Sequence, residues 1–187
     1  MPTLTAYLYS GAMRRLRFFI AIGLFLGLLP VCSISSSGAT ALPPGCNSNQ
    51  LEVLASNWLG AAGNGAMAFD IVNRGAHCRI GGIPTVEFLN GSGIAVDNHD
   101  LHRASMLFAE PKVTMLSVKH GGVVTFGVSW ADNPVNNQTC QVTATARVEL
   151  SHGVGHVSGE VPINPEPCGG YLWVTPIELG AWPQPNG

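Results

Sequence analysis

Strict alternation of apolar and polar residues constrains this chain more than any other feature of its sequence. Between Cys140 and Leu150 every second residue is apolar, and the residues between them are polar. Because successive side chains of a β-strand point to opposite faces of a sheet, this period places all the apolar side chains on one face. Val124 to Trp130 and Met67 to Ile71 repeat the pattern. The alternation therefore predicts half-buried β-strands.

Turn-forming residues divide the rest of the chain into short segments. The sequence holds 23 glycines and 13 prolines, and only 11% of its residues are charged. We predict an all-β fold over residues 42–180, an antiparallel immunoglobulin-like β-sandwich of about eight to nine strands, followed by a Pro-rich tail over 181–187. No segment predicts a convincing helix. The weaker strands are expected at Leu51–Asn57, Thr85–Leu89, Ala104–Phe108, Lys112–Val118, His156–Ile163 and Tyr171–Leu179.

The start of the chain has the pattern of an export signal. Arginines precede an uncharged apolar run from Phe18 to Leu29, which is shorter than the about 20 residues that a membrane-spanning helix needs. The small residues Ala39 and Ala41 then form the A-x-A pattern that signal peptidase cleaves. We predict that residues 1–41 are a signal peptide and that the protein is secreted or held in the cell envelope.

Other beginnings and processing routes stay open. The true start is Met1 or Met13, since a chain beginning at Met13 would open with a conventional basic segment. Cys32 resembles the cysteine of a lipidation signal, although Val31 stands where such signals need glycine, alanine or serine. A twin-arginine signal is a further alternative, but its third arginine stands where an apolar residue is preferred. General secretory export is the route that we expect.

The charge balance excludes some classes of partner. The chain has 9 basic and 11 acidic residues, and several of the basic ones lie in the predicted signal peptide. This composition predicts no nucleic-acid binding, because such proteins need a basic footprint. We expect membrane contact only through the signal peptide or, alternatively, through a lipid on Cys32.

Cys46, Cys78, Cys140 and Cys168 are expected to form disulfides, because an exported chain enters an oxidising compartment. Four cysteines allow three connectivities. If the segments near 51–57 and 66–73 form an antiparallel hairpin, the start of the first lies beside the end of the second, which brings Cys46 close to Cys78. The segment that follows Cys140 turns and returns in the same way to Cys168. We predict these two pairs as structural staples, because no two cysteines are close enough in sequence for a redox motif.

The order of these landmarks resembles the actinobacterial exported family known as domain of unknown function 4232. The resemblance extends from Cys46 to about Leu179, and it implies a β-sandwich with the same cysteine framework. It implies no catalytic residues. The residues that show it are Cys46, Asn73-Arg-Gly-Ala-His-Cys78, Gly82-Ile-Pro84 with Val86, Gly121-Gly122, Val128-Ser-Trp130, Cys140, Cys168 and Leu172-Trp-Val174.

Two close histidine pairs are candidate metal ligands, because imidazole is the commonest protein ligand for zinc and copper. They are His99 with His102 and His152 with His156. Positions four apart on an extended strand lie about 13 Å from each other, so the second pair needs a folded turn to share an ion. We interpret both pairs as solvated loop histidines and predict no metal and no cofactor.

Other residue types offer little catalytic chemistry. The segment 90–93 lacks the pattern of a nucleophile elbow, and Ser117 with Lys119 lacks the supporting motifs of penicillin-recognising enzymes. Asp70, Glu87 and Glu149 stand among alternating strand positions, so an acid/base pair would require cross-strand neighbours.

The tryptophans bear on a binding function, since aromatic side chains flank sugars and anchor protein interfaces. Trp130 shares a face with apolar neighbours and is expected in the core. Trp173 is expected on the opposite sheet face or at an edge, and Trp58 and Trp182 border turn-rich segments.

These observations favour a non-enzymatic, exported module that binds a protein or a polysaccharide of the cell envelope. A purely structural envelope protein is a further hypothesis. The alternative from another class is an envelope enzyme or metal carrier that uses His99 and His102 or His152 and His156.

Overall fold

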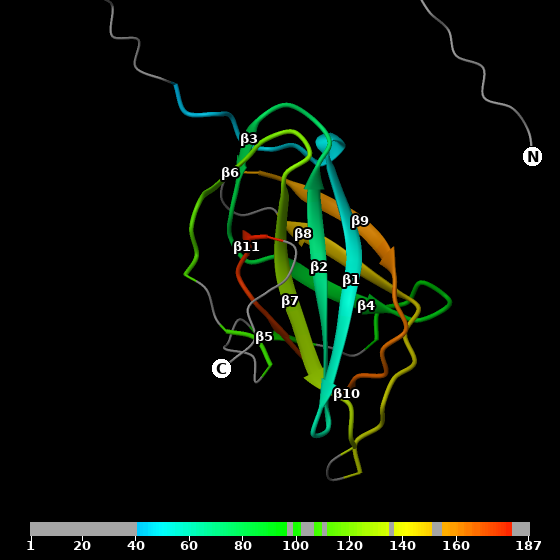
Figure 1. The fold of residues 1–187 in the computed structure, drawn as a ribbon. Coiled ribbons are helices and arrows are strands. Elements are labelled where there is room, and N and C mark those ends of the chain that lie inside the picture. Colours follow the sequence, from blue (N-terminus) through cyan, green and yellow to red (C-terminus); the bar gives the residue numbers. More distant parts are fainter. Residues whose placement is uncertain are drawn as a thin grey trace, which may run out of the picture. The chain divides into compact units, whose positions relative to one another are not determined.

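The computed structural model describes residues 41–96, 99–101, 107–109, 112–134, 137–150 and 155–180, which belong to one compact unit. These residues form eleven strands and one short 3-10 helix, so the fold is all-β, as predicted (Figure 1). None of the helical structure in this part of the chain is long and apolar enough to cross a membrane. The elements are η1 (Ser48–Gln50), β1 (Leu51–Ala61), β2 (Asn64–Asn73), β3 (Cys78–Ile80), β4 (Thr85–Leu89), β5 (His99–Leu101), β6 (Leu116–Val118), β7 (Val123–Ala131), β8 (Thr145–Leu150), β9 (Val157–Pro162), β10 (Cys168–Val174) and β11 (Glu178–Leu179).

Antiparallel pairing organises most of these strands. The largest sheet has six strands in the order β1-β2-β7-β10-β5, with β11 also pairing with β7. The strands β4, β8 and β9 form a second sheet, and β3 and β6 form a two-stranded ribbon. Among the described strands, β5 pairs in parallel with β10. Figure 1 shows β4, β8 and β9 crossing behind the long strands of the main sheet, so that the sandwich has two layers.

The core lies between these layers. Phe69 on β2 and Phe126 on β7 stack with ring centroids 5.1 Å apart, and Phe88 on β4 meets Trp130 on β7 edge-on at 5.6 Å. All four side chains are fully buried. Each belongs to the apolar set of an alternating segment, so the alternation turns these side chains toward the opposite sheet.

The outer face of the main sheet is covered as well. Phe108, between β5 and β6 in the sequence, is fully buried and lies against Gly127 on β7. A Cβ atom at position 127 would lie 2.5 Å from Cε2 of the Phe108 ring, so glycine is the residue that leaves room for it. Ala68 and Ser129, on the same outer face, are also buried. Burial on both faces explains why β2 and β7 have small or apolar residues at most positions.

The predicted strand over Cys140–Leu150 begins only at Thr145. Its first residues pair irregularly with the chain that follows β9, where Pro165 and Pro167 lie opposite them. The carbonyls of these prolines accept bonds from the N–H groups of residues 143 and 141, but proline has no N–H to complete a regular ladder.

The predicted strand over Tyr171–Leu179 is two strands, β10 and β11. Thr175 and Pro176 separate them, and the Gly127 N–H donates to Oγ1 of Thr175 at 2.8 Å instead of continuing the ladder. In the predicted strand Lys112–Val118 only β6 is regular. The short strands β3 and β5 were not predicted. Of the predicted strand Ala104–Phe108, residues 104–106 lie outside the described residues, and Leu107 and Phe108 belong to none of the eleven strands.

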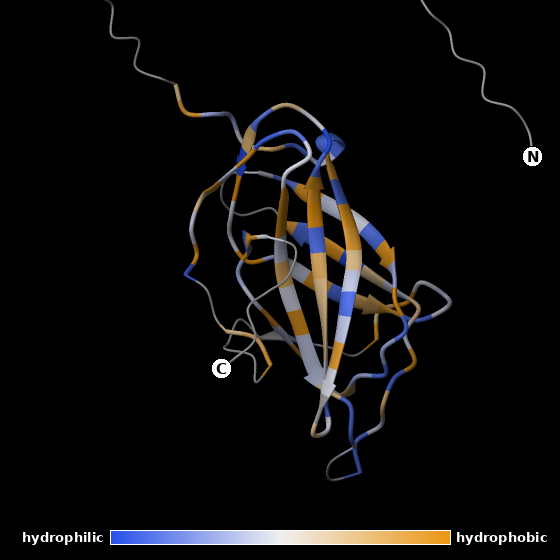
Figure 2. Ribbon diagram, viewed as in Figure 1, coloured by the Kyte–Doolittle hydropathy of each residue, from blue (hydrophilic) through white to orange (hydrophobic). Residues whose placement is uncertain are grey.

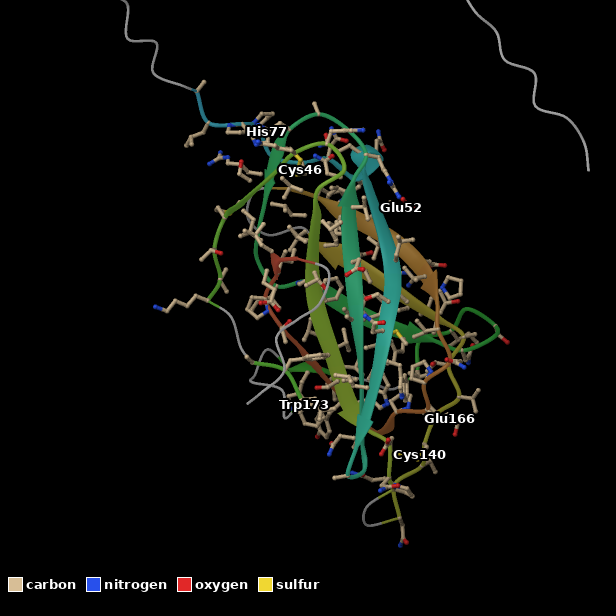
Figure 3. All side chains as sticks on the ribbon, viewed as in Figure 1. Cys46, Glu52, His77, Cys140, Glu166 and Trp173 are labelled. Carbon is tan, nitrogen blue, oxygen red and sulfur yellow. A yellow bond between two sulfur atoms is a disulfide. The ribbon has the colours of Figure 1, made fainter. Side chains whose placement is uncertain are left out.

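Both predicted disulfides are present. Cys46 is bonded to Cys78 and Cys140 is bonded to Cys168, with Cα atoms 4.9 Å and 3.9 Å apart. The two bonds lie near opposite ends of the main sheet, as the labels of Cys46 and Cys140 show in Figure 3. Each bond joins the segment before a hairpin to the segment after it, so each end of the sandwich has a covalent cross-link.

The predicted signal peptide, including Ala39 and Cys32, lies outside the described residues, except for Ala41. The tail over 181–187, with Trp182, also lies outside them. These assignments stay predictions.

Candidate functional site

A polar hollow of about 280 Å³ lies beside the Cys140–Cys168 disulfide. Its walls come from the loop between β7 and β8 and from the start of β10. The disulfide holds these two segments together, and the Gln141 N–H adds a bond of 2.9 Å to the carbonyl oxygen of Pro167. The lining residues are Asn137, Gln138, Thr139, Gln141, Gly169 and Gly170.

The two glycines shape the floor of this amide hollow. Gly169 and Gly170 have φ angles of 74° and 72°, in the left-handed region that favours glycine. A Cβ atom at Gly169 would lie 2.6 Å from Oε1 of Gln138. Glycine therefore lets the chain turn sharply after the disulfide and lets the Gln138 amide lie directly on the backbone.

The chemistry of the amide hollow is neutral hydrogen bonding. Its lining side chains are three carboxamides and one hydroxyl, which offer both donors and acceptors and no charge. Asn137, Gln138, Thr139 and Gln141 are exposed, so their polar groups are available to a ligand. A hollow of this kind suits a ligand with many hydroxyl groups better than an ion.

An aromatic residue follows the lining residues of the amide hollow in the sequence. Tyr171 follows Gly170 directly and is 45% exposed. Its ring centroid lies 6.0 Å from that of His99 on β5, so the parallel pairing of β5 with β10 brings these two rings together. The sequence did not predict this pair, because a parallel neighbour follows from the topology and not from a local pattern.

The predicted histidine pairs are only partly described. His99 lies on β5, and His156 directly precedes β9. The backbone N–H of His156 donates to the carbonyl oxygen of Cys46 at 2.9 Å. Both side chains are exposed. His102 and His152 lie outside the described residues. Within the described ranges, no three histidine, cysteine or carboxylate side chains gather as a metal site would require.

The strand carboxylates Glu87 and Glu149 lie on the outer face of the second sheet. Arg147 forms ion pairs of 2.7 Å with Glu87 and 2.9 Å with Glu160, across three neighbouring strands. Hydrogen bonding to Glu160 raises the pKa of Arg147, and the charge of Glu87 adds to the effect. A smaller hollow of about 170 Å³ lies here, lined by Thr85 with Glu87, Arg147 and Glu149. Arg147 is shared between Glu87 and Glu160, so these three residues form an ion-pair network at the surface.

Asp70 lies on the outer face of the main sheet, opposite Thr125 on β7. Its Oδ1 atom is buried and has no hydrogen-bond partner. Burial raises the pKa of Asp70 above 3.8, while the neighbouring hydroxyl groups of Thr125 and Ser56 act in the opposite direction. No second carboxylate pairs with it in the described ladders, so the structure does not assemble an acid/base pair here.

A serine–histidine contact that the sequence did not predict lies on the β3–β6 ribbon. Nε2 of His77 and Oγ of Ser117 are 2.7 Å apart. Both residues are exposed, and neither lines the two hollows described above. In a catalytic triad a carboxylate orients the histidine, and no described carboxylate bonds to His77. We therefore interpret the contact as a surface hydrogen bond without a catalytic role.

The tryptophans divide between core and surface. Trp130 is fully buried, which confirms the expected core position. Trp58 is 49% exposed and its ring lies 5.1 Å from that of Trp130. Trp173 pairs with Ser129 on the outer face of the main sheet and is partly exposed, opposite the core residues Leu172 and Val174.

Residues 46–178 match a family model described as "Domain of unknown function (DUF4232)". The chain belongs to the DUF4232 family. The match begins at the first disulfide cysteine and ends at the first residue of β11, so it covers all of the described strands except Leu179. Searches of curated proteins and of solved structures found no match.

The DUF4232 resemblance includes Asn73, and the structure shows what this side chain does. Asn73 is fully buried at the end of β2. Its Nδ2 donates to the carbonyl oxygens of Ala76 and Val118, both at 2.9 Å, and its Oδ1 accepts from the Gly75 N–H at 2.9 Å. One amide thus fixes the turn that leads to Cys78 and ties it to β6. This part of the motif is structural.

Proposed function

We propose that this DUF4232 protein is an exported, non-catalytic binding module of the cell envelope, and that the amide hollow binds a neutral polysaccharide. The observation that supports this proposal is the lining of the hollow, which is formed by uncharged carboxamide and hydroxyl groups. Polysaccharide hydroxyls can both donate to and accept from such groups. An anionic or cationic ligand would find no opposite charge there.

The size of the amide hollow favours one unit of a longer chain. Its volume of about 280 Å³ is just below the range of about 300–1,000 Å³ that is usual for small-molecule sites. Because its lining side chains are exposed, a chain could continue beyond the hollow in either direction. The partly exposed ring of Tyr171 would supply an apolar surface for a neighbouring unit.

Binding without catalysis is the function that this chemistry supports. Glycoside hydrolysis uses two carboxyl groups about 5–10 Å apart across the reacting bond. None of the described residues that line the amide hollow is a carboxylate. We therefore expect the bound polysaccharide to be recovered at its original length.

The test is a binding assay with the exported chain, its disulfides intact, on arrays of neutral and acidic envelope polysaccharides. Changing Thr139→Val together with Gln141→Leu removes two hydrogen-bonding groups of the hollow. At about 1 kcal/mol for each lost bond, the affinity should fall about 30-fold. Ser158→Ala, at an exposed position of β9, is the matched control and should bind like the parent.

Two results would contradict the proposal. One is binding to acidic but not neutral polysaccharides, and the other is unchanged affinity in the double variant. Shortening of the polysaccharide during incubation would refute the non-catalytic part separately.

A further inference from the structure

The β3–β6 ribbon has one buried and one exposed face. Cys78 pairs with Val118, and both side chains are buried in the core. Because side chains alternate along a strand, the next pair, Arg79 with Ser117, faces outward. Lys119 follows β6 and is exposed. The outward face of this ribbon therefore lies at the surface of the sandwich, at the Cys46–Cys78 end.

This outward face is cationic. Arg79 and Lys119 stand on it, and the exposed Lys112 precedes β6. No acidic residue occurs in the segments 77–81 and 112–119 that make up the ribbon and its approach. The whole-chain composition predicts no basic footprint, but the ribbon places Arg79 and Lys119 on one face.

Apolar side chains are exposed beside these charges. Val113 is 59% exposed and Met115 is 44% exposed, in the chain that leads into β6. Met115 lies close to Gly81, since a Cβ atom there would be 3.1 Å from its sulfur atom. Figure 2 shows the hydrophobic colouring of this approach on the outside of the molecule, at the left of the view. Exposed apolar residues among cations are typical of surfaces that meet a lipid interface.

The N-terminal part of the chain joins the domain at the same surface. The Arg79 N–H donates to the carbonyl oxygen of Pro44 at 2.8 Å, and Nε of Arg79 donates to that of Pro43 at 2.7 Å. The Cys46 N–H in turn donates to the carbonyl oxygen of Arg79 at 2.9 Å. These bonds hold residues 43–46 along β3. Leu42, just before them, is 74% exposed.

We propose that the ribbon patch, formed by Leu42, Arg79, Val113, Met115 and Lys119, docks on an anionic phospholipid membrane. Its cations would meet lipid phosphates, and its apolar side chains would enter the interface. The position of the N-terminal segment supports this occupant. Cleavage after Ala41 would leave a positively charged amine on Leu42, within the patch.

The alternative processing route leads to the same contact. If Cys32 carries a lipid, the ten residues between it and Pro43 span at most about 35 Å. The ribbon is then the part of the domain that the tether draws toward the bilayer. Docking thus requires no choice between the two routes, and it does not depend on the proposed polysaccharide site.

The docked orientation would turn the amide hollow outward. The patch lies at the Cys46–Cys78 end and the hollow lies beside Cys140–Cys168, at the other end of β2 (Figure 3). The ten residues of β2 extend about 33 Å at the usual rise for each residue. The hollow would therefore face away from the membrane.

The experiment is sedimentation of the exported chain with vesicles of phosphatidylcholine, with or without phosphatidylglycerol. We expect binding to the anionic vesicles that weakens in high salt. Lys119→Gln should lower the partition coefficient about fivefold, which is the usual effect of one cation near such a surface. Val113→Ser with Met115→Ser should lower it further, and hydrogen exchange over residues 112–119 should slow only when anionic vesicles are present.

Matched controls separate this patch from general charge and hydrophobicity. Arg147→Gln removes the same charge from the second sheet, and Val142→Ser removes an apolar side chain that is 70% exposed in the loop before β8. Both variants should bind vesicles like the parent. Equal binding to neutral and anionic vesicles, or equal losses in Lys119→Gln and Arg147→Gln, would overturn the proposal. So would salt-sensitive binding to an acidic polysaccharide with no binding to vesicles.

Discussion

Replacement of Gly127 by alanine is the most direct test of how the outer face of the main sheet is covered. The new Cβ atom would lie 2.5 Å from Cε2 and 2.9 Å from Cγ of the Phe108 ring. Carbon atoms in ordinary contact are about 3.5–4.0 Å apart, so the ring has to move by about 1 Å or leave its site. Gly127 does not have a positive φ angle, so the cost comes from this contact and not from the backbone.

The magnitude follows from the two possible responses of Phe108. If the ring shifts within its site, overpacking costs about 1–3 kcal/mol. If the ring is expelled, the cost approaches the about 3–5 kcal/mol of a buried phenylalanine truncated to alanine. We expect Gly127→Ala to lower the free energy of unfolding by about 2–4 kcal/mol, a large part of the about 5–15 kcal/mol that a domain has.

Urea denaturation with the disulfides intact measures this effect, and a double-mutant cycle identifies its cause. Once Phe108→Ala has removed the ring, adding Gly127→Ala should change the stability by less than about 0.5 kcal/mol. Gly159→Ala is the control, since its nearest neighbour would be Cγ2 of Val53 at 3.6 Å, an ordinary contact. That control should be neutral or slightly stabilising.

Additive costs of the two substitutions would refute this reasoning, because they would mean that the alanine at 127 destabilises without touching the ring. A cost for Gly159→Ala equal to that for Gly127→Ala would do the same. Either result would mean that the contact between Gly127 and the Phe108 ring does not explain how the outer face is buried.

Three further predictions concern single groups. Asn73→Ala should cost about 3 kcal/mol in urea denaturation, because it leaves buried backbone groups without partners; a loss below about 1 kcal/mol would contradict that role. Since burial raises the pKa of Asp70, the stability that its neutral carboxyl provides is present below pH 3.8 and is lost as the pH rises through the raised pKa of the folded state. Asp70→Asn should therefore gain stability over the parent at neutral pH but not in acid, and equal midpoints at both pH values would be evidence against it. Cys140→Ser with Cys168→Ser should cost about 3.5 kcal/mol, because the bond closes a loop of 28 residues, and the same variant should bind polysaccharide more weakly.

Local patterns in the sequence were sufficient to predict much of the fold. The alternation over 124–130 and 146–150 correctly predicted which side chains of β7 and β8 face the core, because successive side chains of a strand point to opposite faces. It was wrong at Val142, which is 70% exposed while Thr143 is buried, and the second face of β7 is buried as well. The disulfide pairs followed from hairpin geometry, since an antiparallel hairpin brings its outer ends together. Both inferences depend on neighbours in sequence, and a single chain shows those directly.

What the sequence did not predict depends on contacts between distant segments. Tyr171 pairs with His99 on β5, and β5 runs parallel to β10. Phe108 covers Gly127 from a segment between β5 and β6, and no local period in the sequence predicts this contact. The amide hollow was missed for the same reason. Its amides, hydroxyl and glycines are ordinary loop residues until the Cys140–Cys168 bond places them around one space.

The proline at the end of β9 has a consequence for how molecules of this protein meet one another. A free sheet edge with unpaired N–H groups can recruit the edge of a second molecule, and such pairing is the usual beginning of β-aggregation. β9 is the last strand of the second sheet, and its Pro162 has no N–H to offer at that edge. β9 also contacts β1, the outermost strand of the main sheet, so each edge shields the other. A β-protein built in this way can accumulate in a crowded space while its molecules remain separate.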